Sequence, residues 1–80
     1  MNQVNKMEFA QRLRLLRKTH GMTQEQLACK INYTIRCVQS WETGSRLPCY
    51  DALAALAQLF HVSADYLLCL DLAQTRRANP

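Results

Sequence analysis

Apolar residues recur at helical spacing in several separate stretches of the chain, and polar residues occupy most of the positions between them. In the first stretch, Phe9, Leu13 and Leu16 follow one another at intervals of four and three residues. This spacing places their side chains on one face of an amphipathic helix. Gly21 follows, and glycine readily adopts the left-handed conformation that ends many helices. The pattern predicts a first helix over residues 6–20.

Two short helices are predicted next, and only a few residues separate them. Thr23 and Gln26 have the spacing of a capping box, which opens a helix of about two turns. Asn32 is one of the few non-glycine residues that tolerate a positive φ angle, so it can reverse the chain after this helix. Thr34 then caps a third helix, which Gly44 ends. Two helices joined this tightly form the pattern of a helix-turn-helix.

Two further helices complete the predicted fold. Pro48 can precede a helix but not continue one, so a fourth helix is expected to begin one or two residues after it and to end at His61. Residues 63–65 contain serine and aspartate, which cap helices, and a fifth helix is predicted over residues 66–70. No stretch has the periodicity of a strand. The predicted fold class is therefore all-α, a compact domain of five helices.

Length and periodicity together divide the chain into three predicted parts. Residues 1–8 form a lead-in, residues 9–70 form the folded domain with its helix-turn-helix at residues 23–42, and residues 71–80, which lose the apolar period, form a tail. A chain of 80 residues buries only about 60% of its extended surface, so its core is modest. We expect one domain and little room for a second function.

Positive charge is concentrated in the first part of the sequence. The formal net charge is +4. Residues 1–50 hold eight lysines and arginines against three acids, a balance of +5, whereas residues 51–80 hold two against three, a balance of −1. This asymmetry favours a polyanion as partner, although a moderately basic, solvated surface produces the same balance.

Neither a metal site, nor a cofactor, nor an enzymatic activity is expected from the residues present. The cysteines are spaced 8, 12 and 20 residues apart, which matches no zinc-ligand pattern. We interpret them as buried or half-buried small apolar residues. The two histidines form no recognisable catalytic set with a cysteine, serine or acid. The cysteines are Cys29, Cys37, Cys49 and Cys69.

The sequence also lacks the features of a membrane protein. No apolar run approaches the roughly 18 residues that a membrane-spanning helix needs, and the N-terminus lacks the apolar segment of a signal peptide. We therefore expect a cytoplasmic protein without a membrane partner.

Four segments together resemble the lambda-repressor-like family, also called XRE or Cro-like helix-turn-helix proteins. The resemblance covers about residues 9–70 without a gap. Each segment alone is a weak signal, whereas their joint order and spacing form a strong one. The segments are Thr23-Gln24-Glu25-Gln26-Leu27-Ala28, Trp41-Glu42 with Gly44, Arg46-x-Pro48, and His61-Val62-Ser63-x-Asp65-Tyr66-Leu67-Leu68.

The resemblance implies a function in gene regulation. It implies a small transcriptional regulator, a repressor in preference to an activator, that binds double-stranded DNA sequence-specifically with a recognition helix, residues 34–42, in the major groove. Two alternatives remain open: an antitoxin or restriction-modification controller built on the same fold, and a protein-interaction module that has lost DNA binding. The positive balance of residues 1–50 argues against the interaction module.

The resemblance also implies which side chains face the DNA. Arg36 is expected to read a base, because its guanidinium can bond guanine O6 and N7 together; the alternative is a solvated or phosphate-bound arginine. Gln24, at the start of the second helix, is expected at a phosphate. Arg46, in the loop after the third helix, is expected at the DNA backbone or else as a solvated loop charge. The full set is Gln24, Thr34, Ile35, Arg36, Gln39, Ser40, Ser45 and Arg46.

An ion pair and a dimer interface are the remaining expectations. The resemblance implies that Arg17 pairs with Glu42 and so fixes the angle between the first and third helices. Leu68, Leu70 and Leu72 offer more apolar surface than one short helix buries, so they are expected either to pack on the first helix or to form a two-fold interface. A homodimer on DNA would hold two recognition helices about 34 Å apart, over a near-palindromic operator. The sequence identifies no further protein partner.

Overall fold

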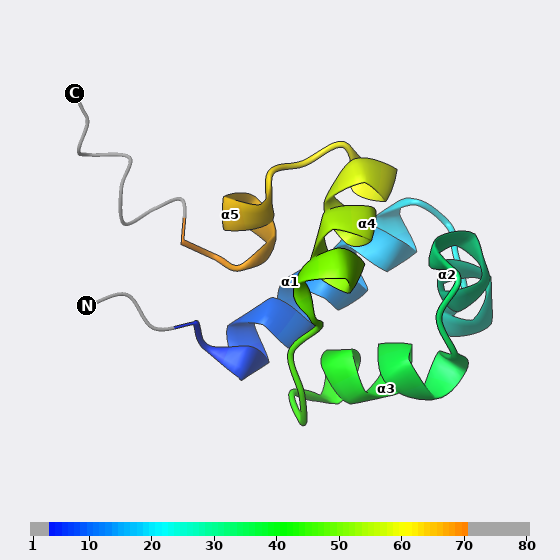
Figure 1. The fold of residues 1–80 in the computed structure, drawn as a ribbon, viewed down its shortest axis with the longest axis horizontal. Helices are drawn as coiled ribbons and strands as arrows, with labels where there is room; N and C mark the ends of the chain where they lie inside the picture. The colour runs from blue at the N-terminus through cyan, green and yellow to red at the C-terminus, as the bar shows by residue number, and fades with distance from the viewer. Residues whose placement is uncertain (1–3, 71–80) are drawn as a thin grey trace.

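Five helices and no strand make up residues 4–70, the part of the chain that the computed structural model describes (Figure 1). The helices are α1 (Lys6–Thr19), α2 (Gln24–Ile31), α3 (Ile35–Thr43), α4 (Tyr50–Phe60) and α5 (Ala64–Leu67). The predicted all-α, five-helix class is confirmed for these residues. None of these helices is long and apolar enough to cross a membrane.

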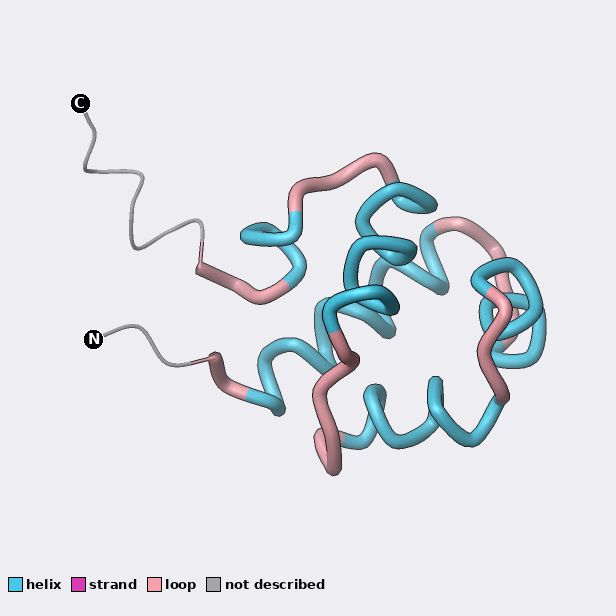
Figure 2. Tube along the Cα trace, viewed as in Figure 1, coloured by secondary structure: helices cyan, strands magenta, loops and turns pink. Residues whose placement is uncertain are grey.

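The helix α1 is the central element of the fold. It packs against α3 and α5, while α2 packs against α3 and α4, and α4 also packs against α5. In Figure 1, α4 crosses in front of α1, α2 and α3 lie toward one side, and α5 lies on the other. Figure 2 shows that only a brief loop joins α2 to α3. The helices α2 and α3 therefore form one unit along an edge of the domain.

The core takes apolar side chains from each of the five helices. Burying one such side chain stabilises a fold by roughly 1.5–3 kcal/mol relative to leaving it exposed. Trp41 is buried on the inner face of α3, and its ring meets the ring of Tyr33 edge-on with centroids 5.6 Å apart. This contact braces the turn between α2 and α3. The fully buried apolar residues include Phe9, Leu13, Leu27, Val38, Leu56 and Leu67.

Three residues in the left-handed conformation end helices where the sequence predicts them. The φ angle is 63° at Asn32, 83° at Gly44 and 57° at His61. Asparagine and histidine are among the side chains that accept this conformation more readily than most. The predicted ends of α2, α3 and α4 are therefore confirmed.

The last helix differs from its prediction. A helix over residues 66–70 was expected, but α5 begins at Ala64 and ends at Leu67. It begins earlier because the Ser63 hydroxyl accepts a hydrogen bond from the Tyr66 amide at 3.0 Å, so serine is the cap. It ends earlier because Cys69 adopts a φ angle of 62°. No sequence signal predicts a left-handed cysteine.

The cysteines are less buried than expected. Cys29 and Cys49 are exposed, Cys37 and Cys69 are half-buried, and all four are free thiols. The interpretation as buried or half-buried residues is therefore wrong for Cys29, on the outer face of α2, and for Cys49, which precedes α4. Within residues 4–70, no three metal-ligating side chains gather into a cluster.

Gly44 is expected to tolerate alanine less well than Gly21 does. Both glycines have positive φ angles, 83° and 69°, which cost an alanine roughly 1–2 kcal/mol. A Cβ atom at Gly21 has nothing within 4 Å, whereas one at Gly44 overlaps Sδ of Met7. In urea denaturation, Gly21→Ala should lose about 1 kcal/mol of unfolding free energy, and Gly44→Ala should lose more. Equal losses would show that the Met7 side chain moves aside without cost.

Candidate nucleic-acid interface

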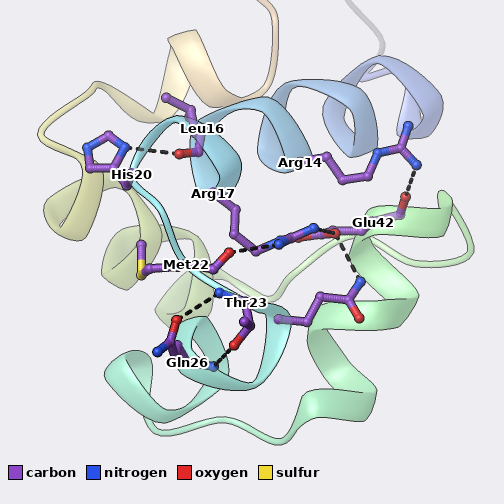
Figure 3. A network of polar contacts seen from close by, with 9 residues as sticks. Arg14, Leu16, Arg17, His20, Met22, Thr23, Gln26 and Glu42 are labelled. Atoms are coloured by element: carbon purple, nitrogen blue, oxygen red, sulfur yellow. Dashed lines mark hydrogen bonds and ion pairs between the residues drawn. The ribbon is translucent and has the colours of Figure 1, made fainter.

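The helices α2 and α3 are short, and side-chain caps hold both of their starts. Thr23 Oγ1 accepts from the Gln26 amide at 3.0 Å, and Gln26 Oε1 accepts from the Thr23 amide at 2.9 Å (Figure 3). Thr34 Oγ1 accepts from the Cys37 amide at 3.2 Å. These bonds satisfy amides that a helix start leaves without partners. The caps let α2 and α3 begin sharply on either side of the turn.

A buried ion pair joins α1 to α3. Arg17 Nε donates to Glu42 Oε2 at 2.7 Å, and Arg17 Nη2 donates to Glu42 Oε1 at 3.1 Å (Figure 3). Arg17 is 9% exposed and Glu42 is 1% exposed. A two-bond arrangement of this kind restricts both side chains to one geometry. The pair that the resemblance implied is thus present, and it fixes the two helices against each other.

The same carboxylate also holds α2. Gln24 Nε2 donates to Glu42 Oε1 at 3.0 Å, and Arg17 Nη1 donates to the Met22 carbonyl at 2.8 Å. Arg14 Nη1 adds a longer bond, 3.3 Å, to the Glu42 carbonyl. Glu42 therefore connects three helices, and the side chain of Gln24, expected at a phosphate, has one of its amide hydrogens directed to Glu42 instead.

The outward face of α3 carries several of the predicted contact residues. Ile35 is 41% exposed, and Arg36 and Gln39 are exposed as well. Ser40 is half-buried, and its hydroxyl donates to the Cys37 carbonyl at 2.8 Å, which leaves the hydroxyl oxygen as an acceptor. Among residues 4–70, no hydrogen bond holds the side chains of Arg36 and Gln39 to the rest of the domain. Such a face suits contact with base edges.

A hollow of about 630 Å³ lies beside α3, and we call it the α3 hollow. It brings together five of the predicted contact residues: Thr34, Arg36, Ser40, Ser45 and Arg46. Gln24, Ile35 and Gln39 do not line it. The other lining residues are not in the predicted contact set: Lys6, Tyr33, Cys37, Trp41, Leu47 and Cys49.

Tyr33 and Cys49 interact at the rim of the α3 hollow. The Tyr33 hydroxyl lies 3.6 Å from Cys49 Sγ. The hydrogen bond from Tyr33 lowers the pKa of the Cys49 thiol, and the backbone amides of Ala52 and Asp51 lower it further. The bond with Cys49 in turn raises the pKa of Tyr33. Both directions follow if the Tyr33 hydroxyl donates to Cys49 Sγ, because such a bond favours the charged form of the thiol and disfavours that of the phenol.

Tyr33→Phe is expected to slow the alkylation of Cys49 at neutral pH. Because the Tyr33 hydroxyl lowers the pKa of Cys49, its removal raises that pKa and decreases the fraction of reactive thiolate. The rate of modification by iodoacetamide, followed by peptide mass spectrometry, should shift to higher pH. Cys29, which is exposed on α2, serves as the internal control. An unchanged profile for Cys49 would show that Tyr33 does not stabilise the thiolate.

The residues expected at a dimer interface lie partly against the domain itself. Leu68 is half-buried and packs against the core, and Leu70 is half-buried. Leu72 lies outside the described residues.

Arg12 attaches α5 to α1, because its Nη1 donates to the Tyr66 carbonyl at 2.8 Å and its guanidinium lies 4.2 Å from the centre of the Tyr66 ring.

The fold and this site define a helix-turn-helix domain whose second helix, α3, has an exposed and largely polar outer face. A family model described as a helix-turn-helix domain matches residues 8–67, which agrees with this fold. The chain belongs to the lambda-repressor-like helix-turn-helix family. The family resemblance stated from the sequence is thus confirmed.

Two curated relatives and two solved structures show what the chain is similar to. YobD of Bacillus subtilis (strain 168), an uncharacterized HTH-type transcriptional regulator, is 47% identical over 60 residues, which are 75% of this chain and 54% of YobD. The HTH-type transcriptional activator BcrR of Enterococcus faecalis is 36% identical over 62 residues, 78% of this chain and 30% of BcrR. The chain thus spans about half the length of YobD or less than a third of BcrR.

The two structures share the arrangement of the helices. The restriction-modification controller protein C.AhdI from Aeromonas hydrophila has a TM-score of 0.73 and 29% identity, covering 81% of this chain and 98% of its own. The DNA-binding domain of the P22 C2 repressor has a TM-score of 0.71 and 31% identity, covering 92% of this chain and 93% of its own.

Proposed function

We propose that the protein is a transcriptional regulator that binds double-stranded DNA sequence-specifically through α3. The observation that carries this proposal is the unit of α2 and α3, which Glu42 fixes to α1 while the far side of α3 remains exposed and polar. A rigid helix with a solvated polar face fits the major groove, whose base pairs present distinct patterns of donors and acceptors.

Each contact residue has a proposed role. Arg36 reads a guanine, Gln39 and Ser40 contact bases or phosphates, and Ile35 meets a thymine methyl group. The amides at the start of α2, with Gln24, face a phosphate, since a helix N-terminus favours an anion. Ser45 and Arg46 contact the backbone. Thr34, whose hydroxyl caps α3, is the remaining residue proposed to contact the DNA.

We further propose that two copies bind a near-palindromic operator. Two-fold symmetry would set their recognition helices about 34 Å apart, which is one turn of the duplex. Leu68 and Leu70 are half-buried and so keep apolar area for a second copy, and Leu72 extends the same stretch of sequence.

The direction of regulation has support on both sides. The P22 C2 repressor and C.AhdI favour repression and restriction-modification control respectively, whereas BcrR is named an activator. We propose repression, with a restriction-modification controller as the second candidate. Fusing the bound sequence to a reporter gene separates the two directions, because a repressor lowers expression and an activator raises it.

Selection from a random duplex pool tests the proposed function. The full chain is incubated with the pool at low ionic strength, and the bound fraction is amplified and sequenced over several rounds. The expected result is one enriched motif with inverted-repeat symmetry. Failure to retain any duplex at low salt would overturn DNA binding, because electrostatic attraction to the DNA phosphates alone supports non-specific binding under those conditions.

A further inference from the structure

The charged residues in the described lining of the α3 hollow are all basic. Three basic residues line it, and they come from three separate segments: Lys6 begins α1, Arg36 lies in α3 and Arg46 lies in the loop after α3. No aspartate or glutamate is among its described lining residues. Thr34, Ser40 and Ser45 add aliphatic hydroxyl groups to the lining, and aromatic, aliphatic and thiol side chains make up the rest of it.

The three basic residues differ from the arginines of α1. Arg17 pairs with Glu42, and Arg14 donates to the Glu42 carbonyl. Within residues 4–70, the structure gives Lys6, Arg36 and Arg46 no ion pair with an acid. Cations gathered around one hollow repel each other, and an anion between them relieves that repulsion.

The packing of α1 against α3 brings Lys6 to this place. A Cβ atom at Gly44 would overlap Sδ of Met7 and would lie 3.7 Å from the Lys6 carbonyl oxygen, so the first turn of α1 lies against the end of α3. Figure 1 shows the start of α1 beside the loop that follows α3. This loop carries Ser45 and Arg46. Lys6 therefore reaches the same side of α3 as Arg46, although the sequence separates them widely.

We propose that the α3 hollow binds a phosphodiester group of the DNA backbone and that Lys6 is one of its ligands. This inference rests on the proposed function and adds α1 to the DNA interface, which the predicted contacts confine to α2, α3 and the following loop. Because three basic residues and three aliphatic hydroxyl groups line the hollow, the group that suits it is an oxyanion with several acceptor atoms.

The test compares Lys6→Gln with Lys18→Gln, a matched control on the same helix. Lys18 is exposed, loses the same charge, and does not line the α3 hollow. Affinity for the selected duplex is measured between about 50 and 200 mM salt, where each lost phosphate contact lowers the magnitude of the salt slope by about 0.9 per protomer. Lys6→Gln should show this change and bind several-fold more weakly at the low end, whereas Lys18→Gln should keep the wild-type slope. Lys6→Arg should restore the slope.

Thermal melting of each variant verifies that it is folded before binding is compared. Equal salt slopes for Lys6→Gln, Lys18→Gln and the wild type would overturn the inference while leaving the proposed function standing. Absence of duplex binding by the wild type would instead overturn the proposed function.

A second experiment distinguishes a phosphate of the DNA backbone from a free phosphate ion as the ligand of the hollow. Chloride is replaced by inorganic phosphate at constant ionic strength, and the affinity for the duplex is measured again. If the hollow holds a phosphodiester group, free phosphate competes with the DNA there, so the wild type should lose more affinity than Lys6→Gln. Stabilisation of the DNA-free wild type by inorganic phosphate in thermal melting, together with equal changes of duplex affinity for the two proteins, would show that the hollow is a site for a free phosphate ion and would overturn the assignment to DNA.

Protection of a cysteine gives a readout that involves no substitution. Cys49 is exposed at the rim of the hollow, and Cys29 is exposed on α2 outside it. Saturation with the selected duplex should slow the alkylation of Cys49 more than that of Cys29. Equal protection of the two thiols would contradict a DNA strand lying over the hollow.

Discussion

Replacing Glu42 with alanine is expected to lower the free energy of unfolding by about 3–5 kcal/mol. The substitution leaves the Arg17 guanidinium in a site where only 9% of the residue is exposed, without the carboxylate that accepts two of its hydrogen bonds. It also removes the acceptor of the Gln24 side chain. A small domain is stable by only about 5–15 kcal/mol in total. The variant should therefore melt at a much lower temperature or fail to fold at 37 °C.

The matched control is Glu25→Ala, which removes an exposed glutamate from α2. Its loss should stay within about 1 kcal/mol, the range of surface charges near a helix start. A combined Arg17→Met and Glu42→Leu variant should be more stable than Glu42→Ala, because an apolar pair leaves no buried charge. Urea denaturation of the variants gives these comparisons. Equal midpoints for Glu42→Ala and the wild type would show that the pair contributes nothing.

The effect should extend to DNA binding, since Glu42 connects the three helices that position the recognition face. Glu42→Ala is therefore expected to lose affinity even at temperatures where it stays folded. Its salt slope should remain close to that of the wild type, because the substitution removes no phosphate contact. Reduced affinity with an unchanged slope would separate misplacement of α3 from loss of a charge contact.

Local chemistry accounts for the parts of the fold that could be predicted from the sequence. The Thr23 cap, the left-handed Asn32 and the Gly44 end depend on residues within a few positions of one another. The start of α5 could not be chosen in the same way, because both Ser63 and Asp65 are able to cap a helix. The early end of α5 follows from the left-handed Cys69, which the sequence does not indicate.

The candidate site likewise has parts that follow from local sequence and parts that depend on how the helices pack. The exposure of Ile35, Arg36 and Gln39 follows from the helical period, which places Val38 and Trp41 on the opposite face of α3. The Arg17 and Glu42 pair was accessible only through the family resemblance. The third bond to Glu42 and the presence of Lys6 in the α3 hollow depend on how α1, α2 and α3 pack. Neither has a signal in sequence spacing.

Arg36→Ala and Arg46→Ala are expected to change DNA binding in different ways. A guanidinium that bonds guanine O6 and N7 contributes about 1–3 kcal/mol of discrimination against the wrong base. Arg36→Ala should therefore weaken binding to the selected sequence by roughly 5- to 150-fold and relax the preference at one position of each half-site. Arg46→Ala should weaken every sequence alike and lower the magnitude of the salt slope by about 0.9 per protomer.

The position of Arg36 makes this comparison informative, because it lies both on the exposed face of α3 and in the lining of the α3 hollow. Repeating the duplex selection with each variant measures preference, and titrations at several salt concentrations measure the phosphate contacts. An unaltered motif for Arg36→Ala, together with a reduced salt slope, would show that Arg36 contacts only phosphate and that base reading depends on Gln39, Ser40 and Ile35. A relaxed position with an unchanged slope would place its guanidinium on a base edge, which leaves Lys6 and Arg46 as the cations available to a phosphate in the hollow.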